Sequence, residues 1–260
     1  MHYGKRFAMP ALLAAIIACS CGTPAFATPV SGDAGALLMD FFAKKFTPDE
    51  MVMVLDEPPD PSGSVRDMYL DIKGCSIGGV RVASLKVRGM GVELTPVSEW
   101  TKGNVDVKRM LHAVADCRIT ADDINRNLLG KDFGDDDHWH GIQLSIGKDG
   151  VYARGYYQVR VLFTLDVLIE ITSRFRIVDA QQIWLSDYTL AVNRVGVPDF
   201  ITDKAVSQIQ PILDLSKFVF PLRLHAIEYE AGAVRIRSRV LPEPIQGVTY
   251  TYKKAAVTPQ

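Results

Sequence analysis

The stretch that decides the fold is Val161-Leu-Phe-Thr-Leu-Asp-Val-Leu-Ile-Glu-Ile-Thr-Ser-Arg-Phe-Arg-Ile177, in which every odd position except Ser173 is apolar. Alternation with a period of two residues predicts a β-strand with one dry face and one solvated face. Such a strand would be about 55 Å long, whereas most strands have about five or six residues. A dry face of this length must be covered by a curled sheet, by a second sheet or by an apolar ligand.

Alternating segments also flank this stretch. After a turn at 178–181, the apolar residues of the next predicted strand are Trp184, Tyr188, Leu190 and Val192. Two further hairpins are expected over 142–156 and 222–241, each around a glycine-containing turn. Upstream strands are expected at 65–73, 80–94 and 105–119. The pattern predicts an α+β fold that is mostly β, a long and strongly curved antiparallel meander.

Helical patterns are few and short. Apolar residues recur at helical spacing over 34–46, 120–130 and 199–210, and the last of these ends at Pro211. A helix rises only about 1.5 Å per residue, so none of the three can cover the long strand. We therefore expect the helices at the edge of the sheet or over its groove.

Four segments are expected along the chain. They are a signal segment at 1–27, a helix with a connecting segment at 28–64, one curved-sheet domain at 65–241 and a C-terminal tail at 242–260. No Ser- or Gly-rich linker divides the long domain, and no repeat with a period of 20–50 residues is present. A single elongated domain is the simplest organisation.

The N-terminus predicts export. Lys5 and Arg6 precede the uncharged, mostly apolar segment 8–18, and Ala25-Phe-Ala27 provides a signal-peptidase site. Two alternatives remain open: a lipoprotein signal that leaves a lipidated Cys19, and an uncleaved anchor. All three place the domain in the periplasm or the cell envelope. The net charge of −1, from 29 basic and 30 acidic residues, excludes a strongly basic nucleic-acid binder.

Two cysteines follow the signal segment. Cys75 and Cys117 form an even pair, and in an oxidising compartment they predict a disulfide that closes a loop of roughly 40 residues. The alternative is two buried free thiols.

Catalytic and metal-binding patterns are weak. The segment 132–140 gathers Asp135, Asp137, His138 and His140, which is a candidate set for a divalent cation. Such a run is more typical of a solvated loop, so no metal site is predicted. No nucleophile–base motif, phosphate-binding loop or dinucleotide-binding pattern is present. We therefore expect neither an enzyme nor a cofactor.

The alternation pattern alone favours neither of two interpretations, a closed β core or a lipid groove. Three motifs follow one another along the chain with the hairpins between them. They are Ile119-Thr-Ala-Asp-Asp-Ile-Asn125, Val197-Pro-Asp-Phe200 and Ile209-Gln-Pro-Ile-Leu-Asp-Leu-Ser216. This order resembles the LmeA-like phospholipid-binding family of exported bacterial proteins over roughly 65–241. The resemblance implies a curved sheet similar to tubular lipid-binding folds, and non-enzymatic phospholipid binding in the cell envelope. It assigns no site residue.

The predicted function is therefore the binding of phospholipid acyl chains in an apolar groove, for lipid binding, transfer or envelope maintenance. The residues expected to line the groove are Val161, Phe163, Leu165, Val167, Ile169, Ile171, Phe175, Ile177, Trp184, Tyr188, Leu190 and Val192. The residues expected to meet headgroups or a membrane surface are Arg174, Arg176, Arg235, Arg237 and Arg239.

Three alternatives stay open beside this hypothesis. The arginines can instead form a solubilising face paired with Asp166, Glu170 and Glu228. The whole protein can be an envelope scaffold or interaction module with a closed core and no ligand. The segment 132–140 can belong to a metal-dependent hydrolase.

Overall fold

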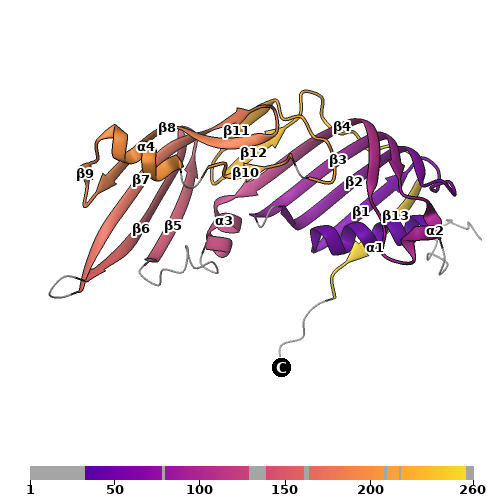
Figure 1. The fold of residues 1–260 in the computed structure, drawn as a ribbon, viewed down its shortest axis with the longest axis horizontal. Helices are drawn as coiled ribbons and strands as arrows, with labels where there is room; N and C mark the ends of the chain where they lie inside the picture. Colours follow the sequence, from indigo (N-terminus) through magenta and orange to yellow (C-terminus); the bar gives the residue numbers. More distant parts are fainter. Residues whose placement is uncertain are drawn as a thin grey trace, which may run out of the picture.

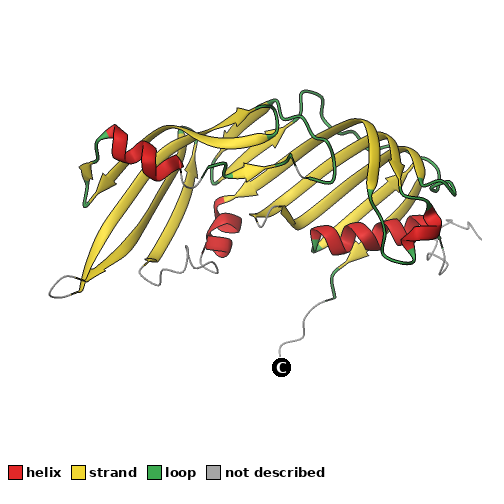
Figure 2. Ribbon diagram, viewed as in Figure 1, coloured by secondary structure: helices red, strands yellow, loops and turns green. Residues whose placement is uncertain are grey.

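The computed structural model describes residues 33–77, 80–128, 139–160, 164–207, 210–216 and 218–255. Their strands form two antiparallel sheets that follow one another along an elongated molecule (Figure 1). Helices are few and lie against the sheets or at their edges (Figure 2). The predicted fold class, a mostly β antiparallel architecture with few helices, is confirmed. The proposed signal segment 1–27 lies outside the described residues.

The first sheet has seven strands in the order β11-β12-β4-β3-β2-β1-β13. Their bounds are Glu50–Leu55 (β1), Ser64–Ile77 (β2), Val80–Leu94 (β3), Val107–Thr120 (β4), Ala226–Glu230 (β11), Ala233–Arg237 (β12) and Val248–Lys253 (β13). Two of these strands correct the expected segments. β1 lies in the segment 28–64 and β13 in the tail 242–260, and they pair with each other at one side of the sheet. The sheet is therefore wider than the domain predicted at 65–241.

The second sheet has the order β10-β8-β7-β6-β5, with β9 paired to β8. Its strands are Trp139–Gly147 (β5), Gly150–Arg160 (β6), Thr164–Val178 (β7), Gln182–Val192 (β8), Val195–Gly196 (β9) and Leu213–Asp214 (β10). The predicted long strand is β7, which has 15 residues. It pairs with β6 on one side and β8 on the other. Because β5 pairs with β6 and β7 pairs with β8, both predicted hairpins of this region are confirmed.

The helices of the described residues are Ala34–Phe46 (α1), Val97–Trp100 (α2), Ala121–Leu128 (α3) and Asp199–Ser207 (α4). Helix α1 begins where the Asp33 side chain accepts a hydrogen bond from the Gly35 N–H (2.9 Å) and ends at Thr47 in the left-handed conformation. No helix of the described segments is both long and apolar enough to cross a bilayer.

Helix α1 packs against β1, β2 and β13 of the first sheet (Figure 1). The fully buried side chains of Leu38, Phe42 and Phe46 face the sheet, and both phenylalanine rings pack against Phe220 at centroid distances of 5.6 and 6.3 Å. Burial of each such side chain contributes about 1.5–3 kcal/mol. The first sheet therefore has its dry face covered by its own chain.

Helix α3 joins the two sheets. Thr120 and Asp123 form a reciprocal cap, in which the Thr120 hydroxyl donates to the Asp123 carboxylate and the Asp123 N–H donates to the hydroxyl oxygen. One turn later the Asn125 amide donates to the carbonyl of Leu144 on β5 (2.9 Å) and accepts from its N–H (2.7 Å). The Ile119–Asn125 motif thus caps a helix and ties it to the second sheet.

Strand β11 makes a second connection between the sheets. The Tyr229 hydroxyl accepts the N–H of Phe175 on β7, and the two rings stack at a centroid distance of 6.4 Å. The β11–β12 turn adds a main-chain bond, from the Gly232 N–H to the Ile146 carbonyl (3.0 Å). We call α3, Tyr229 and this turn the joint.

The predicted disulfide between Cys75 and Cys117 is wrong, because both side chains are free thiols. Cys75 lies on β2 and Cys117 on β4, and β3 runs between them. Two strand spacings put their backbones about 9–10 Å apart, beyond the Cα separation of roughly 7 Å that a disulfide tolerates. The alternative of two free thiols describes the pair.

We expect neither thiol to react with a soluble disulfide reagent in the folded protein at about pH 8. Burial raises the pKa of Cys75 to about 12 and also raises the pKa of Cys117, so the reactive thiolate is scarce. Peptide mapping after labelling, in native buffer and in urea, measures this. Labelling of both cysteines only in urea is the expected result. A Cys75–Cys117 cross-linked peptide would contradict the structure.

We expect Asn125→Ala to lower the free energy of unfolding by about 1–3 kcal/mol, because it leaves the N–H and carbonyl of Leu144 without their partner. Urea unfolding followed by circular dichroism measures the change. Arg126→Ala is the matched control, since Arg126 is the next residue of the same helix and is exposed. Equal stability of the two variants would show that the Asn125 contacts do not hold the joint.

Candidate functional site

The second sheet has one apolar face, and cross-strand pairing defines it. Leu144, Ala153, Ile171 and Leu190 form one row across four strands. Paired residues of neighbouring strands project from the same side of a sheet. The adjacent row is Gly155, Ile169, Val192 and Val195. We call the side of the sheet that carries these rows the lipid face.

Exposure increases along the lipid face with distance from the joint. Near the joint, Ile146 and Val151 are buried and belong to the same hydrophobic cluster as the core of the first sheet. The middle rows, which include Ile171 and Ile169, are half-buried. At the start of β7, Leu165 is 44% exposed, and on the outer strand β9, Val195 is 69% exposed. The apolar surface is therefore continuous with the core at one end and open at the other.

The register places most of the predicted lining residues together. Leu165, Val167, Ile169, Ile171, Phe175 and Ile177 share the lipid face, and Leu190 and Val192 join them from β8. Val161 and Phe163 lie outside the described residues. Of the other two predicted lining residues, Trp184 pairs with Arg176 and does not face the groove, which corrects the expectation. Tyr188 lies beside the register shift and turns its hydroxyl to Asp203 of α4.

A β-bulge explains that correction. The register between β7 and β8 shifts between Thr172 and Arg174, and Asp187 adopts a positive φ of 48°. An extra residue in one strand reverses which side chains face which side beyond it. Leu185 and Ile183 consequently take the places opposite Phe175 and Ile177. The polar Ser186 inside the apolar series was the one sequence signal of this change.

The opposite face of β7 and β8 is polar. Trp184 pairs with Arg176 there, and the guanidinium lies 5.4 Å from the indole centroid. Arg174 lies over the Tyr229 ring at 5.1 Å and donates to the Asp149 carbonyl (2.8 Å). Both predicted headgroup arginines of this sheet therefore lie on its solvated face.

The remaining three arginines belong to the first sheet. Arg235 makes a two-pronged pair with Asp116 (2.7 and 2.6 Å), and Arg237 donates to Glu228 (2.6 Å). The Asp116 pairing raises the pKa of Arg235. Arg239 follows β12 and is exposed. The expectation of a single basic stripe is thus corrected: two sheets share the five arginines, and neighbouring carboxylates neutralise two of them.

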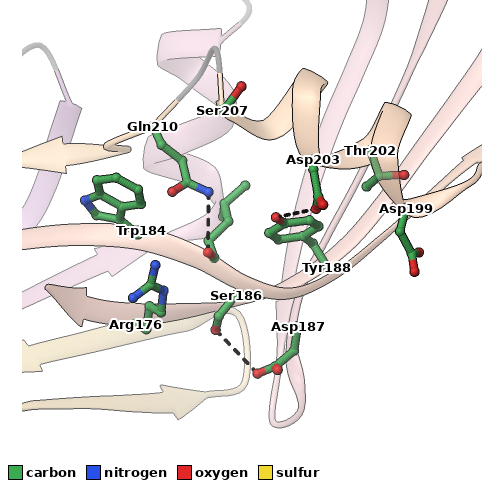
Figure 3. A pocket seen from close by; sticks show the side chains of 11 residues that line it. Arg176, Trp184, Ser186, Asp187, Tyr188, Asp199, Thr202, Asp203, Ser207 and Gln210 are labelled. Carbon is green, nitrogen blue, oxygen red and sulfur yellow. Dashed lines mark hydrogen bonds between the residues drawn. The ribbon is translucent and has the colours of Figure 1, made fainter.

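A polar pocket of about 650 Å³ lies between β8 and α4 (Figure 3). The Tyr188 hydroxyl donates to Asp203 of α4 (2.8 Å), which raises the pKa of Tyr188 and holds the helix against the strand. Three lining carboxylates, of Asp187, Asp199 and Asp203, accompany the one guanidinium of Arg176. The pocket is therefore a solvated, net-acidic feature beside the lipid face.

The candidate metal ligands are only partly described. Asp135, Asp137 and His138 lie outside the described residues. His140 stacks on Tyr156 at a centroid distance of 5.6 Å, and its Nε2 lies 3.6 Å from the Asp166 carboxylate. Within the described ranges, no group of three or more His, Cys, Asp or Glu side chains is placed to hold a metal ion.

Comparison with known proteins identifies the family. The model of the LmeA-like phospholipid-binding family matches residues 62–239, which run from the start of β2 to the end of β12. No curated protein and no solved structure matches the chain. The match covers the joint and the lipid face, and it confirms the resemblance seen in the sequence. The chain belongs to the LmeA-like phospholipid-binding family.

Proposed function

We propose that this protein is an exported, non-enzymatic protein of the cell envelope that holds phospholipid acyl chains against its lipid face. The observation that carries the proposal is the continuous apolar surface of the second sheet, half-buried in its middle and open at the end far from the joint. The first sheet differs, because α1 and the Phe218–Phe220 segment already cover its apolar face. Family membership supports phospholipid as the ligand class.

The energetics favour a lipid as the cover. Each methylene removed from water contributes about 0.8 kcal/mol. The half-buried side chains of Val167, Ile169, Ile171, Leu190 and Val192 offer a strip along which an acyl chain gains this energy at successive methylenes. An extended chain running along β7 would meet one apolar row after another. The end of the acyl chain far from the joint would lie where the lipid face is most exposed.

Headgroup contact at a membrane surface is proposed for the arginines that are free of carboxylate partners among the described contacts. Two of these arginines lie on the face opposite to the lipid face, so they are not assigned to the headgroup of a lipid held there. The guanidinium groups of Arg174 and Arg176 lie over aromatic rings and form no described bond with a carboxylate, and Arg239 is exposed. Arg235 and Arg237 are already neutralised, so we assign them to the solubilising face. Guanidinium groups match phosphate geometry well. A phospholipid, at a membrane surface or bound singly, is the proposed partner.

Export rests on the sequence of the N-terminus. The basic residues, apolar segment and Ala25-Phe-Ala27 site support translocation into the envelope, with Cys19 as the lipidation point if the lipoprotein signal is used. In that compartment the protein would bind, transfer or store phospholipid for envelope maintenance.

We expect Ile171→Glu to abolish lipid retention while the protein stays folded. Ile171 lies in the middle of the lipid face and is half-buried. A carboxylate at this position must stay hydrated, so it would keep acyl chains off the lipid face. Thr172→Glu is the matched control, because Thr172 is the next residue of β7 and is exposed on the opposite face. Native mass spectrometry with lipid extraction measures retention. Equal retention by both variants would show that the lipid face is not the binding surface.

The same measurement on the unaltered protein tests the function itself. Gentle purification from the native envelope should yield phospholipid at about one molecule per chain, because the proposal assigns one binding surface, the lipid face, to each chain. A lipid-free mass that does not change after incubation with phospholipid vesicles would contradict the proposal. That result would support an envelope scaffold or interaction module.

A further inference from the structure

The β9–α4 segment carries a cluster of exposed apolar side chains. Val195 is 69% exposed, Phe200 is 73% exposed and Ile201 is 44% exposed, all within seven residues. Single exposed apolar residues are common on protein surfaces, but contiguous ones mark interaction sites. Phe200 belongs to the Val197–Phe200 motif, and the lipid face gives this residue no role. We call these three residues the apolar tip.

The apolar tip is held firmly by the rest of the second sheet. Asn193 binds β7 through two contacts, from its N–H to the Leu168 carbonyl (2.8 Å) and from the Leu168 N–H to its side-chain oxygen (3.0 Å). Helix α4 anchors through the buried Thr202 and Val206, which lie one turn apart. The helix thus presents Phe200 and Ile201 to solvent because its other side is already packed.

The tip is continuous with the lipid face at its open end. Val195 pairs with Val192, which pairs with Ile169, so Val195 is the outermost residue of a lipid-face row. In Figure 1, β9 lies near the end of the molecule farthest from the first sheet, and α4 runs back from it along β8. Exposure along the lipid face is also greatest at this end, at Leu165 and Val195. The tip therefore stands where an acyl chain would enter or leave.

The charges around the tip balance. Arg194 and Lys204 are exposed beside it, and Asp199 and Asp203 lie on the same helix. Two cations and two carboxylates give no net attraction to an anionic surface. Any binding at the tip must then be carried by its apolar side chains, which is how amphipathic segments enter the interfacial layer of a bilayer.

We propose that the apolar tip is the membrane-docking element of this protein, and that Phe200 and Ile201 insert into the interfacial layer of a phospholipid bilayer. Docking through the tip brings the open end of the lipid face against the membrane, so that an acyl chain passes from one apolar environment to the next. The inference rests on the proposed lipid binding and adds the surface by which the protein meets its lipid source.

The test separates docking from lipid binding. Flotation of the full chain with vesicles of phosphatidylethanolamine and phosphatidylglycerol measures docking. Fluorescence of a monomeric short-chain phosphatidylcholine probe measures occupancy of the lipid face without a membrane. The double substitution Phe200→Ser with Ile201→Ser should weaken vesicle binding by about tenfold or more, and should leave probe binding unchanged.

Leu111→Ser is the matched control, since Leu111 is 68% exposed on β4 of the other sheet. It should float with vesicles as the unaltered protein does. Phe200→Trp should also keep vesicle binding, and the blue shift of tryptophan emission on adding vesicles should exceed that of the unaltered protein.

Four results would overturn the docking proposal. They are flotation of the double variant at the unaltered level, an equal loss of flotation in Leu111→Ser, absence of flotation in the unaltered protein, and a dimer of the unaltered protein that the double variant converts to monomer. The last would make the tip a contact between two copies of the chain. Flotation without probe binding would instead leave docking in place and remove the lipid-face proposal.

Discussion

Strand β7 imposes the constraint on which the rest of the structure depends, because one of its faces is apolar along nearly its whole length. An apolar face on a sheet must be shielded from water, and the cost of leaving it open grows with its area. In the described part of the chain, this face is shielded best at the joint, where Ile146, Val151 and Phe175 pack into the shared core. Beyond the joint, Ile171, Ile169 and Val167 are half-buried, and Leu165 and Val195 are exposed.

The two sheets divide the tasks of stability and binding. The first sheet surrounds α1, and its Leu38, Phe42 and Phe46 give it a core that needs no ligand. Among the described residues, the second sheet has no helix that packs across several of its strands as α1 does on the first. Its α4 lies beside the edge strand β8, fixed by the Tyr188–Asp203 hydrogen bond. One sheet therefore anchors the fold, and the other presents a surface for a ligand.

The joint keeps the second sheet in place without covering it. The Asn125 side chain forms two hydrogen bonds with the main chain of Leu144. The Tyr229 hydroxyl accepts the Phe175 N–H at the start of the half-exposed region. Both contacts are directional hydrogen bonds to backbone atoms, so they fix the orientation of the second sheet, and Ile146, Val151 and Phe175 add apolar packing at this end. The lipid face can then remain open while the molecule stays a single elongated unit.

Much of this architecture was determined by the sequence alone, and for a local reason. The period-two alternation of 161–177 specifies the long strand and its apolar face, and the turn residues specify the hairpins beside it. The three predicted helices start and stop at local signals such as Asp33 and Pro211. Sequence resemblance also identified the family. Such features depend on residues within a few positions of one another.

Only the tertiary structure decided what depends on residues far apart. The bulge at Asp187 sends Trp184 to the polar face, since the parity of β8 is set by its pairing with β7. The strand β3 between Cys75 and Cys117 keeps their thiols apart, which a count of cysteines does not show. The partners of Arg235 and of the tail strand β13 come from distant segments. Register and strand order follow from which faces can be buried together, and that is a property of the whole chain.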